Sequence, residues 1–330
     1  MNLRILSGMR PTAKLHLGNY FSVLKNWVKL QEDNECYFCV VDWHALTSDY
    51  ADTSLIRYYT REITIDYLSC GLDPEKSVIF LQSQVKEHAE LFLLLGMLAT
   101  VGRLERVPTY KEVRAEIKDK DLSTFGFLGY PVLMAADILM YKADAVPVGK
   151  DQEYHIEFTR EIARKFNALY GNVLAVPRAL FAPIAKVPGI DGRKMSKSYG
   201  NAIFLSDTFD EVRKKIMPMV TDTNRKRRTD PGDPDKCPIW LYHLLFNDDE
   251  ESRNMIANGC RKAKIGCVDC KKILLQKIKE KMEPIWEKRA KLEQDQNYIL
   301  DVLKTGSQKA RETARKTMES VNEAVRIGLR

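Results

Sequence analysis

The sequence predicts an α/β protein in which a doubly wound parallel sheet is followed by a helical domain. Short apolar segments alternate with helical patterns of ten or more residues in the first half, which is typical of parallel strands joined by right-handed crossovers. After Ser206 the strand signals stop and only helical patterns follow. The chain of 330 residues, 45% of them hydrophobic, is long enough for about two ordinary cores.

The predicted elements follow from apolar periodicity and from glycine or proline boundaries. Strands are expected at 4–6, 36–41, 77–83 and 145–149, and helices at 54–71, from about 87, at 131–141 and at 151–171. In the second half, helices are expected at 208–216, 238–246, 267–291 and 309–325. We therefore predict a catalytic domain at 1–205, a helical domain at 206–308 and a final helix at 309–330, for which packing back on the first domain is one arrangement.

Composition and charge narrow the class of protein. No apolar stretch reaches the roughly 20 residues that span a membrane, and the N-terminus lacks a secretory signal, so a cytoplasmic protein is expected by elimination. The net charge is +7, and residues 261–330 hold 18 Lys and Arg against 10 Asp and Glu. This basic end favours an acidic partner such as nucleic acid, although solvated helices also favour Lys and Arg.

Two separate stretches suggest a polyphosphate site. After the first predicted strand, a turn leads to a helix start at His16 and Asn19, where a helix N-terminus favours anions. The stretch DGRKMSKSYGN places Lys194 and Lys197 on a glycine-bounded loop that could close over a triphosphate. The plainer interpretations are an ordinary capped helix and a solvated surface loop. The two features together, about 175 residues apart, favour the nucleotide site.

These two stretches carry a resemblance to the class I aminoacyl-tRNA synthetases. HLGN at 16–19 resembles the first signature of that class, and KMSKS at 194–198 matches the second letter for letter. The segments ILSGMRPTAKLHLGNY and PVLMAADILMYKADAVPVGKDQEYHIEFTREIARKFN resemble the tryptophanyl branch, and the likeness covers essentially the whole chain. It implies a Rossmann-like domain, Mg²⁺ with ATP, L-tryptophan and tRNA(Trp) as partners, and a homodimer.

The resemblance also implies residue roles. Lys194 and Lys197, with help from Ser196, would stabilise departing pyrophosphate, and His16 and Asn19 complete the expected catalytic set. Charge stabilisation and positioning would carry the reaction without a protein nucleophile. The expected ATP-binding residues are Met9, Arg10, Thr12, His16, Gly18, Asn19, Lys111, Gly149, Asp151, Lys194, Met195, Ser196, Lys197 and Ser198.

Asp137 is the candidate that selects the amino acid. A carboxylate in the apolar stretch PVLMAADILMY needs a partner, which is either a structural one such as Lys142 or the indole N–H of tryptophan. Tyrosine is the alternative substrate, but Leu6 stands where tyrosyl relatives present a Tyr. The other expected tryptophan-binding residues are Met134, Ile138, Val146 and Val148 around the ring, Gln152 at the α-amino end, and Tyr130 and His44 behind them; His44 is equally interpretable as a core histidine.

Four of the seven cysteines are grouped in the second half. Cys237, Cys260, Cys267 and Cys270 have the spacing C-x22-C-x6-C-x2-C, and in a cytoplasmic protein such a group favours a metal over disulfides. Zn²⁺ and an iron–sulfur cluster are both chemically possible. The spacing resembles that of bacterial tryptophanyl enzymes with a [4Fe–4S] cluster, which we expect here in a structural role, with zinc or free thiols as alternatives.

The expected tRNA contacts are the basic residues near these cysteines: Arg225, Lys226, Arg227, Arg228, Lys271 and Lys272. As phosphate contacts they would give salt-dependent affinity rather than specificity. Two other classes fit part of the sequence. A small-molecule nucleotidyltransferase would not need the long basic helical section, and a non-catalytic RNA-binding relative would not need the intact lysine loop.

Overall fold

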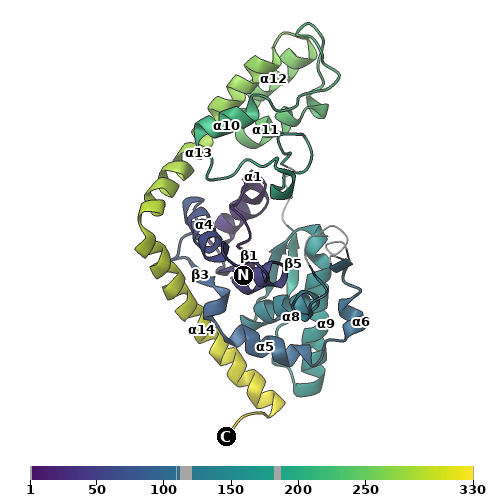
Figure 1. The fold of residues 1–330 in the computed structure, drawn as a ribbon, viewed down its shortest axis with the longest axis vertical. Coiled ribbons are helices and arrows are strands. Elements are labelled where there is room, and N and C mark those ends of the chain that lie inside the picture. Colours follow the sequence, from purple (N-terminus) through teal and green to yellow (C-terminus); the bar gives the residue numbers. More distant parts are fainter. Residues whose placement is uncertain (1, 109, 112–120, 182–186, 330) are drawn as a thin grey trace. The chain divides into compact units, whose positions relative to one another are not determined.

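The computed structural model describes residues 2–108, 110–111, 121–181 and 187–329. The chain forms two compact units (Figure 1). The sheet unit comprises residues 1–13, 27–182 and 295–330, and the helical unit comprises 14–26 and 183–294. The boundary predicted at 205/206 falls inside the helical unit, and the division into three domains stays a prediction.

The sheet unit contains one five-stranded sheet in the order β3-β2-β1-β4-β5, with every pair parallel. The strands are β1 (Arg4–Met9), β2 (Glu35–Val40), β3 (Ser77–Leu81), β4 (Ala145–Val148) and β5 (Arg178–Phe181). This order confirms the predicted doubly wound fold, because the strand order reverses beside β1. β5 was not predicted, since it is short and its four residues are exposed or only half-buried.

Helices cover the sheet and complete its core. They are α2 (Lys25–Leu30), which begins at the unit boundary, α3 (Asp42–Asp49), α4 (Ile56–Ser69), α5 (Glu87–Gly96), α6 (Val101–Leu104), α8 (Phe125–Met140) and α9 (Glu153–Tyr170), with 3₁₀ turns η2 (Gln82–Gln84) and η3 (Lys150–Gln152). The core cluster joins β1, β2 and β4 with α5, α8, α9 and α14 (Gln296–Val325). The predicted apolar helix around 131–141 is thereby placed at the centre of the unit.

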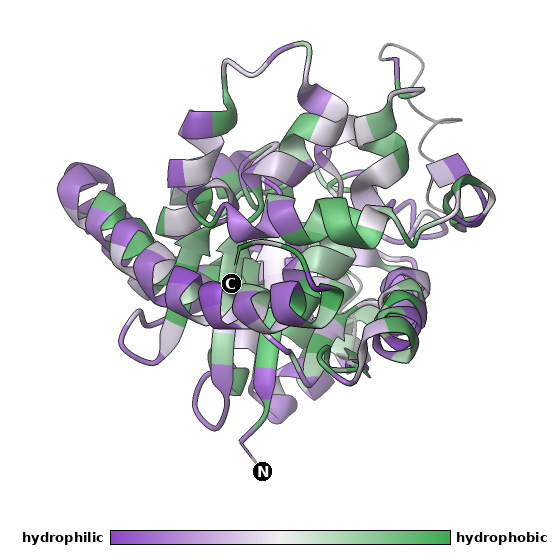
Figure 2. Cartoon of the chain, turned by 90° about the horizontal axis from the view of Figure 1, so that it is seen from below, coloured by the Kyte–Doolittle hydropathy of each residue, from purple (hydrophilic) through white to green (hydrophobic). Residues whose placement is uncertain are grey.

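The final helix is longer than predicted. α14 is continuous from Gln296, so the helix expected from Lys309 begins 13 residues earlier, at an Asp295 N-cap whose side chain accepts from Tyr298 N–H. Its buried residues recur every three or four positions, and hydrophilic and hydrophobic residues alternate along it (Figure 2). The apolar face packs on β3, α5, α4 and α8.

The helical unit is built from capped helices and turns. It contains α1 (Leu17–Asn19), the π-helical turn η1 (Tyr20–Leu24), the 3₁₀ turns η4 (Lys197–Tyr199) and η5 (Pro234–Lys236), and the helices α10 (Phe209–Ile216), α11 (Pro238–Phe246), α12 (Glu250–Arg261) and α13 (Cys267–Gln294). Phe21 packs edge-on against Phe246 with ring centroids 5.0 Å apart, which fixes the N-terminal segment on α11. α12 was not predicted from the sequence, although its Asp249 N-cap and its acidic first turn are typical of a helix N-terminus.

Across the described ranges, none of the helices combines the length and the apolar character that crossing a membrane requires.

Candidate active site

The residues predicted to bind the amino acid belong to the sheet unit, in which strand order reverses beside β1. β1 and β4 are paired neighbours, and open parallel sheets bind ligands beyond the carboxyl ends of such strands. Leu6 on β1 and Val146 on β4 belong to the buried core cluster, as does Ile138 on α8. Met134 and Val148 are partly buried against the same cluster. These five residues therefore pack in one core cluster, from three elements of one unit.

Asp137 is at the centre of a buried hydrogen-bond network. Its Oδ1 accepts from His88 Nδ1 at 2.6 Å, and its Oδ2 accepts from His44 Nε2 at 3.0 Å. Gln82 Nε2 lies 2.8 Å from both carboxylate oxygens. These partners replace Lys142, which the sequence had offered as the structural alternative. His44 is buried and its ring is hydrogen-bonded to the carboxylate, which fits both the predicted place beside the substrate and the alternative of a satisfied core histidine.

The network keeps Asp137 ionised and fixes the amide of Gln82. Burial by itself raises the pKa of Asp137, but His88 and His44 lower it by a larger amount, so that the resulting pKa is about 2. Gln82 Oε1 accepts the backbone N–H groups of Trp43 and His44 at 3.1 and 3.3 Å, so its NH₂ must face the carboxylate. Sequence reasoning missed Gln82 and His88. The signals were a Gln ending an apolar strand and a His inside an apolar helix.

Three further candidate residues, Tyr130, Gln152 and Arg10, also belong to the sheet unit. Tyr130 Oη is 3.4 Å from His155 Nε2, and their rings meet edge-to-face. Gln152 is half-buried in η3. Arg10 follows β1 and is held by Ser48 Oγ and by Asp49 at 3.9 Å, so it is anchored in place.

His16 begins the first helical turn of the helical unit. Its Nδ1 accepts from Asn19 N–H at 3.3 Å, and Asn19 Oδ1 accepts from His16 N–H at 3.0 Å, which is a reciprocal capping box. Burial, together with a smaller contribution from the charge of Lys194, lowers the pKa of His16 to about 4. A neutral imidazole that accepts at Nδ1 carries its proton on Nε2. Gly18 is required, since a Cβ there would lie 2.8 Å from the imidazole ring.

The lysine loop is tied at its base by Asn201. The buried amide accepts from Ser196 N–H at 2.8 Å and donates to Asp191 Oδ1 at 2.8 Å and to Lys194 O at 3.2 Å. Met195 is buried, whereas Lys194 and Lys197 are exposed. Ser196 Oγ accepts from Ser198 N–H and caps η4. The loop therefore has two exposed lysines and a hydrogen-bonded base.

The two signature stretches meet within the helical unit. Leu17 N–H donates to Ile203 O at 2.9 Å, and Leu205 N–H donates to Leu15 O at 2.9 Å, so the chain after the lysine loop runs antiparallel to the segment before α1. The structure thus brings together His16, Gly18, Asn19 and the 194–198 loop. The other expected ATP residues, Met9, Arg10, Thr12, Lys111 and Gly149, belong to the sheet unit, and the side chain of Asp151 lies outside the described residues.

The four grouped cysteines also come close together. Burial raises the pKa of Cys270 to about 12, and the charges of Cys237, Cys260 and Cys267 act in the same direction. Arg225 Nη1 lies 3.8 Å from Cys260 Sγ and 3.9 Å from Cys267 Sγ. The donor set suits a thiolate-bound metal, but within the described ranges no group of three or more His, Cys, Asp or Glu is arranged as a metal site.

The expected tRNA residues divide into two groups. Arg225 is buried and donates to Arg228 O and Ile265 O, both at 2.8 Å. Lys271 is buried and donates to Met217 O and Met219 O at 2.7 and 2.6 Å. Neither side chain is exposed as a phosphate contact requires. The exposed members of the set are Lys226, Arg227, Arg228 and Lys272.

Comparisons with known proteins identify the family of the chain. The family model described as tRNA synthetases class I (W and Y) matches residues 1–283. A tryptophan–tRNA ligase of Thermotoga maritima is 57% identical over 98% of this chain and 99% of its own, and that of Aquifex aeolicus is 46% identical over 98% and 100%. A tryptophanyl-tRNA synthetase of Campylobacter jejuni, crystallised with ADP and tryptophan, superposes with a TM-score of 0.90 at 35% identity, over 98% of this chain and all of the other. The chain belongs to the class I tRNA synthetases of the tryptophan and tyrosine type, within the tryptophan–tRNA ligases.

Proposed function

We propose that the chain activates L-tryptophan with ATP, releases pyrophosphate and transfers tryptophan to tRNA(Trp), and that Asp137 selects the substrate. The ionised, buried carboxylate carries this proposal, because the indole N–H can only donate a hydrogen bond. A carboxylate offers about four lone-pair sites, and His88, His44 and the two contacts of Gln82 occupy them here, so the indole N–H would replace one of the two Gln82 contacts.

The apolar neighbours favour tryptophan over tyrosine. A phenol hydroxyl donates and also accepts, so it gains most from a partner that satisfies both roles. Leu6, which is 5% exposed, offers neither role, and Ile138 and Val146 are equally apolar. A site that hydrogen-bonds one substrate group rejects an analogue lacking that group by about 10⁴-fold or more.

The helical unit would supply the charge for adenylate formation. The carboxylate of tryptophan attacks the α-phosphorus of ATP, and the bond to the bridging oxygen of pyrophosphate breaks. Exposed Lys194 and Lys197 would neutralise the leaving pyrophosphate, and neutral His16 would donate from Nε2 to a phosphate oxygen. Mg²⁺ would arrive with ATP.

The test is tryptophan-dependent exchange of pyrophosphate into ATP by wild type and by Asp137→Asn. We expect wild type to prefer tryptophan over its 3-benzothienyl analogue, in which sulfur replaces the indole N–H. Asp137→Asn should lower kcat/KM for tryptophan by about 100-fold, as expected when a charged hydrogen-bond partner is lost, with little change for ATP. Equal use of both amino acids by wild type, or exchange with tyrosine alone, would refute the assignment.

We also propose a [4Fe–4S] cluster on Cys237, Cys260, Cys267 and Cys270. The grouping of the cysteines supports it, because Arg225 Nη1 lies 3.8 Å from Cys260 Sγ and 3.9 Å from Cys267 Sγ, where its guanidinium would offset thiolate charge. The cluster would hold η5, α12 and α13 together. Anaerobic purification should give brown protein with about four iron and four sulfide per chain, and Cys260→Ser should lose both while Cys70→Ser keeps them. Colourless protein with equimolar zinc would overturn the cluster.

The proposed partners are a second copy of the chain and tRNA. An apolar surface on α5, α6 and α8 supports the homodimer, since Leu93, Met97, Val101 and Phe125 are each 58–74% exposed. Met97→Lys should shift sedimentation toward the monomer, and monomeric wild type would contradict the proposal of a homodimer.

Four exposed basic residues of the helical unit would contact tRNA phosphates. They are Lys226, Arg227, Arg228 and Lys272, and their neutralisation should reduce the salt dependence of tRNA affinity.

A further inference from the structure

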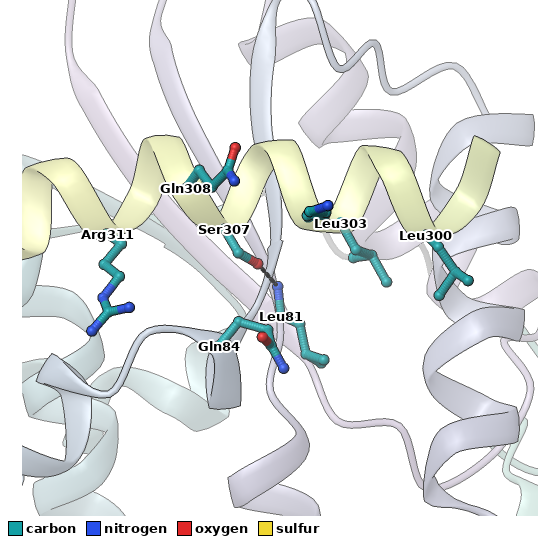
Figure 3. Close-up of a pocket in the computed structure, with 8 residues that line it drawn as sticks. Leu81, Gln84, Leu300, Leu303, Ser307, Gln308 and Arg311 are labelled. Atoms are coloured by element: carbon teal, nitrogen blue, oxygen red, sulfur yellow. Dashed lines mark hydrogen bonds between the residues drawn. The ribbon is translucent and has the colours of Figure 1, made fainter. Parts of the chain in front are cut away.

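The C-terminal helix contacts the residues that directly precede two partners of Asp137. Gln82 and His88 bind the carboxylate, and both are fully buried. Ser307 on α14 accepts the backbone N–H of Leu81, which precedes Gln82, at 3.2 Å (Figure 3). Arg311, one helical turn further, donates to Glu87 Oε1, which precedes His88, at 2.9 Å. One face of α14 thus contacts both Leu81 and Glu87.

These contacts are close and specific. Gly306 lets α14 touch the strand backbone, because a Cβ there would lie only 1.8 Å from Ile79 O. Ser307 is 5% exposed, and its hydroxyl accepts the Leu81 N–H in a partly buried place, so removal of the hydroxyl takes away that partner. Glu87 has a 9% exposed side chain, and Arg315 lies 3.6 Å from the same Oε1. The carboxylate of Glu87 is thereby held from two successive turns.

Each contact of α14 is made to the residue next to a hydrogen-bond donor of the Asp137 carboxylate. At the first, the Gln82 amide cannot rotate freely, because Oε1 is held by two backbone N–H groups of α3 while Nε2 faces Asp137. At the second, His88 is fixed between Asp137 and Tyr141 Oη, which lies 2.7 Å from His88 Nε2. A shift of the chain at 81 or 87 must therefore move a donor of the carboxylate.

We propose that Ser307 and Arg311 are positioning residues for amino-acid selection: α14 sets the placement of Gln82 and His88, and through them the orientation of the Asp137 carboxylate. This inference rests on the proposed role of Asp137. Neither residue is required to touch substrate. Their effect should therefore fall on discrimination at the indole N–H rather than on ATP use.

The experiment compares tryptophan with its 3-benzothienyl analogue in pyrophosphate exchange by the full chain. Ser307→Ala and Arg311→Met should each raise KM for tryptophan by about threefold or more, and lower the tryptophan-to-analogue ratio of kcat/KM by a similar factor, with KM for ATP unchanged. Arg311→Lys should restore part of the ratio. Lys309→Gln, an exposed change on the same helix, is the matched control and should match wild type.

The ratio separates positioning from general damage, because a smaller folded fraction lowers kcat/KM for both amino acids equally. Arg311 is 43% exposed, so Arg311→Met is expected to fold, which a thermal transition can verify. An unchanged ratio in both Ser307→Ala and Arg311→Met, while Asp137→Asn loses the preference, would overturn the inference alone. Wild type without any preference for tryptophan would overturn the role of Asp137 and this inference with it.

Discussion

Replacement of Gly306 by Ala sets two known effects against each other. In an open helix, Ala is favoured over Gly by about 1 kcal/mol. Here the added Cβ would lie 1.8 Å from Ile79 O and 2.7 Å from Ile79 C. Because ordinary contacts begin near 3.4 Å, α14 would have to withdraw from β3 by roughly 1.6 Å, enough to lose most dispersion contacts at that point.

The withdrawal would also break the Ser307–Leu81 hydrogen bond and loosen buried side chains such as Ala310 and Leu303. Overpacking typically costs about 1–3 kcal/mol, and a lost hydrogen bond about 1 kcal/mol more. After the gain in helix propensity, we expect net destabilisation of about 2 kcal/mol. For the sheet unit of about 200 residues, that corresponds to a fall in Tm of roughly 4–8 °C.

Thermal unfolding followed by circular dichroism measures this change, and pyrophosphate exchange measures its effect on tryptophan KM. The matched control is Gly126→Ala on α8, where no atom lies within 4 Å of the added Cβ, so that Tm should stay level or rise. A Gly306→Ala protein as stable as wild type, with unchanged tryptophan KM, would refute the close packing of α14 on β3.

Three further predictions concern the helical unit. Asn201→Ala should lower kcat for exchange by about 10–100-fold through loss of loop positioning, while calorimetry shows unchanged tryptophan affinity; weakened tryptophan binding would count against this reasoning. Gly18→Ala should displace the His16 ring and raise KM for ATP by about tenfold, whereas Gly96→Ala should leave it unaltered. The pKa of His16 is about 4 when folded and 6.5 in its unperturbed state, so its contribution to stability is complete above pH 6.5 and is lost as the pH falls through about 4. Urea titrations at a series of pH values measure the free energy of unfolding of wild type and of His16→Gln. Its dependence on pH should be the same in both proteins above pH 6.5 and should differ between them below pH 6.5. The same pH dependence in both proteins throughout would contradict the shift.

Local patterns predicted much of the fold and part of the site. The strands near 4, 36, 77 and 145 were predicted because apolar runs between turn residues mark buried strands. β5 and α12 were missed, since one is half-exposed and the other is mostly polar. Asp137 was identified from the sequence as a carboxylate among apolar residues, but its partners were not, because they are 55, 49 and 93 positions away.

Neighbouring residues along the chain were enough to identify the two candidate phosphate-binding stretches, the carboxylate among apolar residues and the alternation of strand and helix. Which of these groups meet could be seen only in the folded chain. The fold placed Gln82 and His88 on Asp137, buried Arg225 and Lys271 on backbone carbonyls, and seated α14 on β3. Those outcomes depend on packing and on the need to satisfy every buried polar group, and both are set by segments far apart in the sequence.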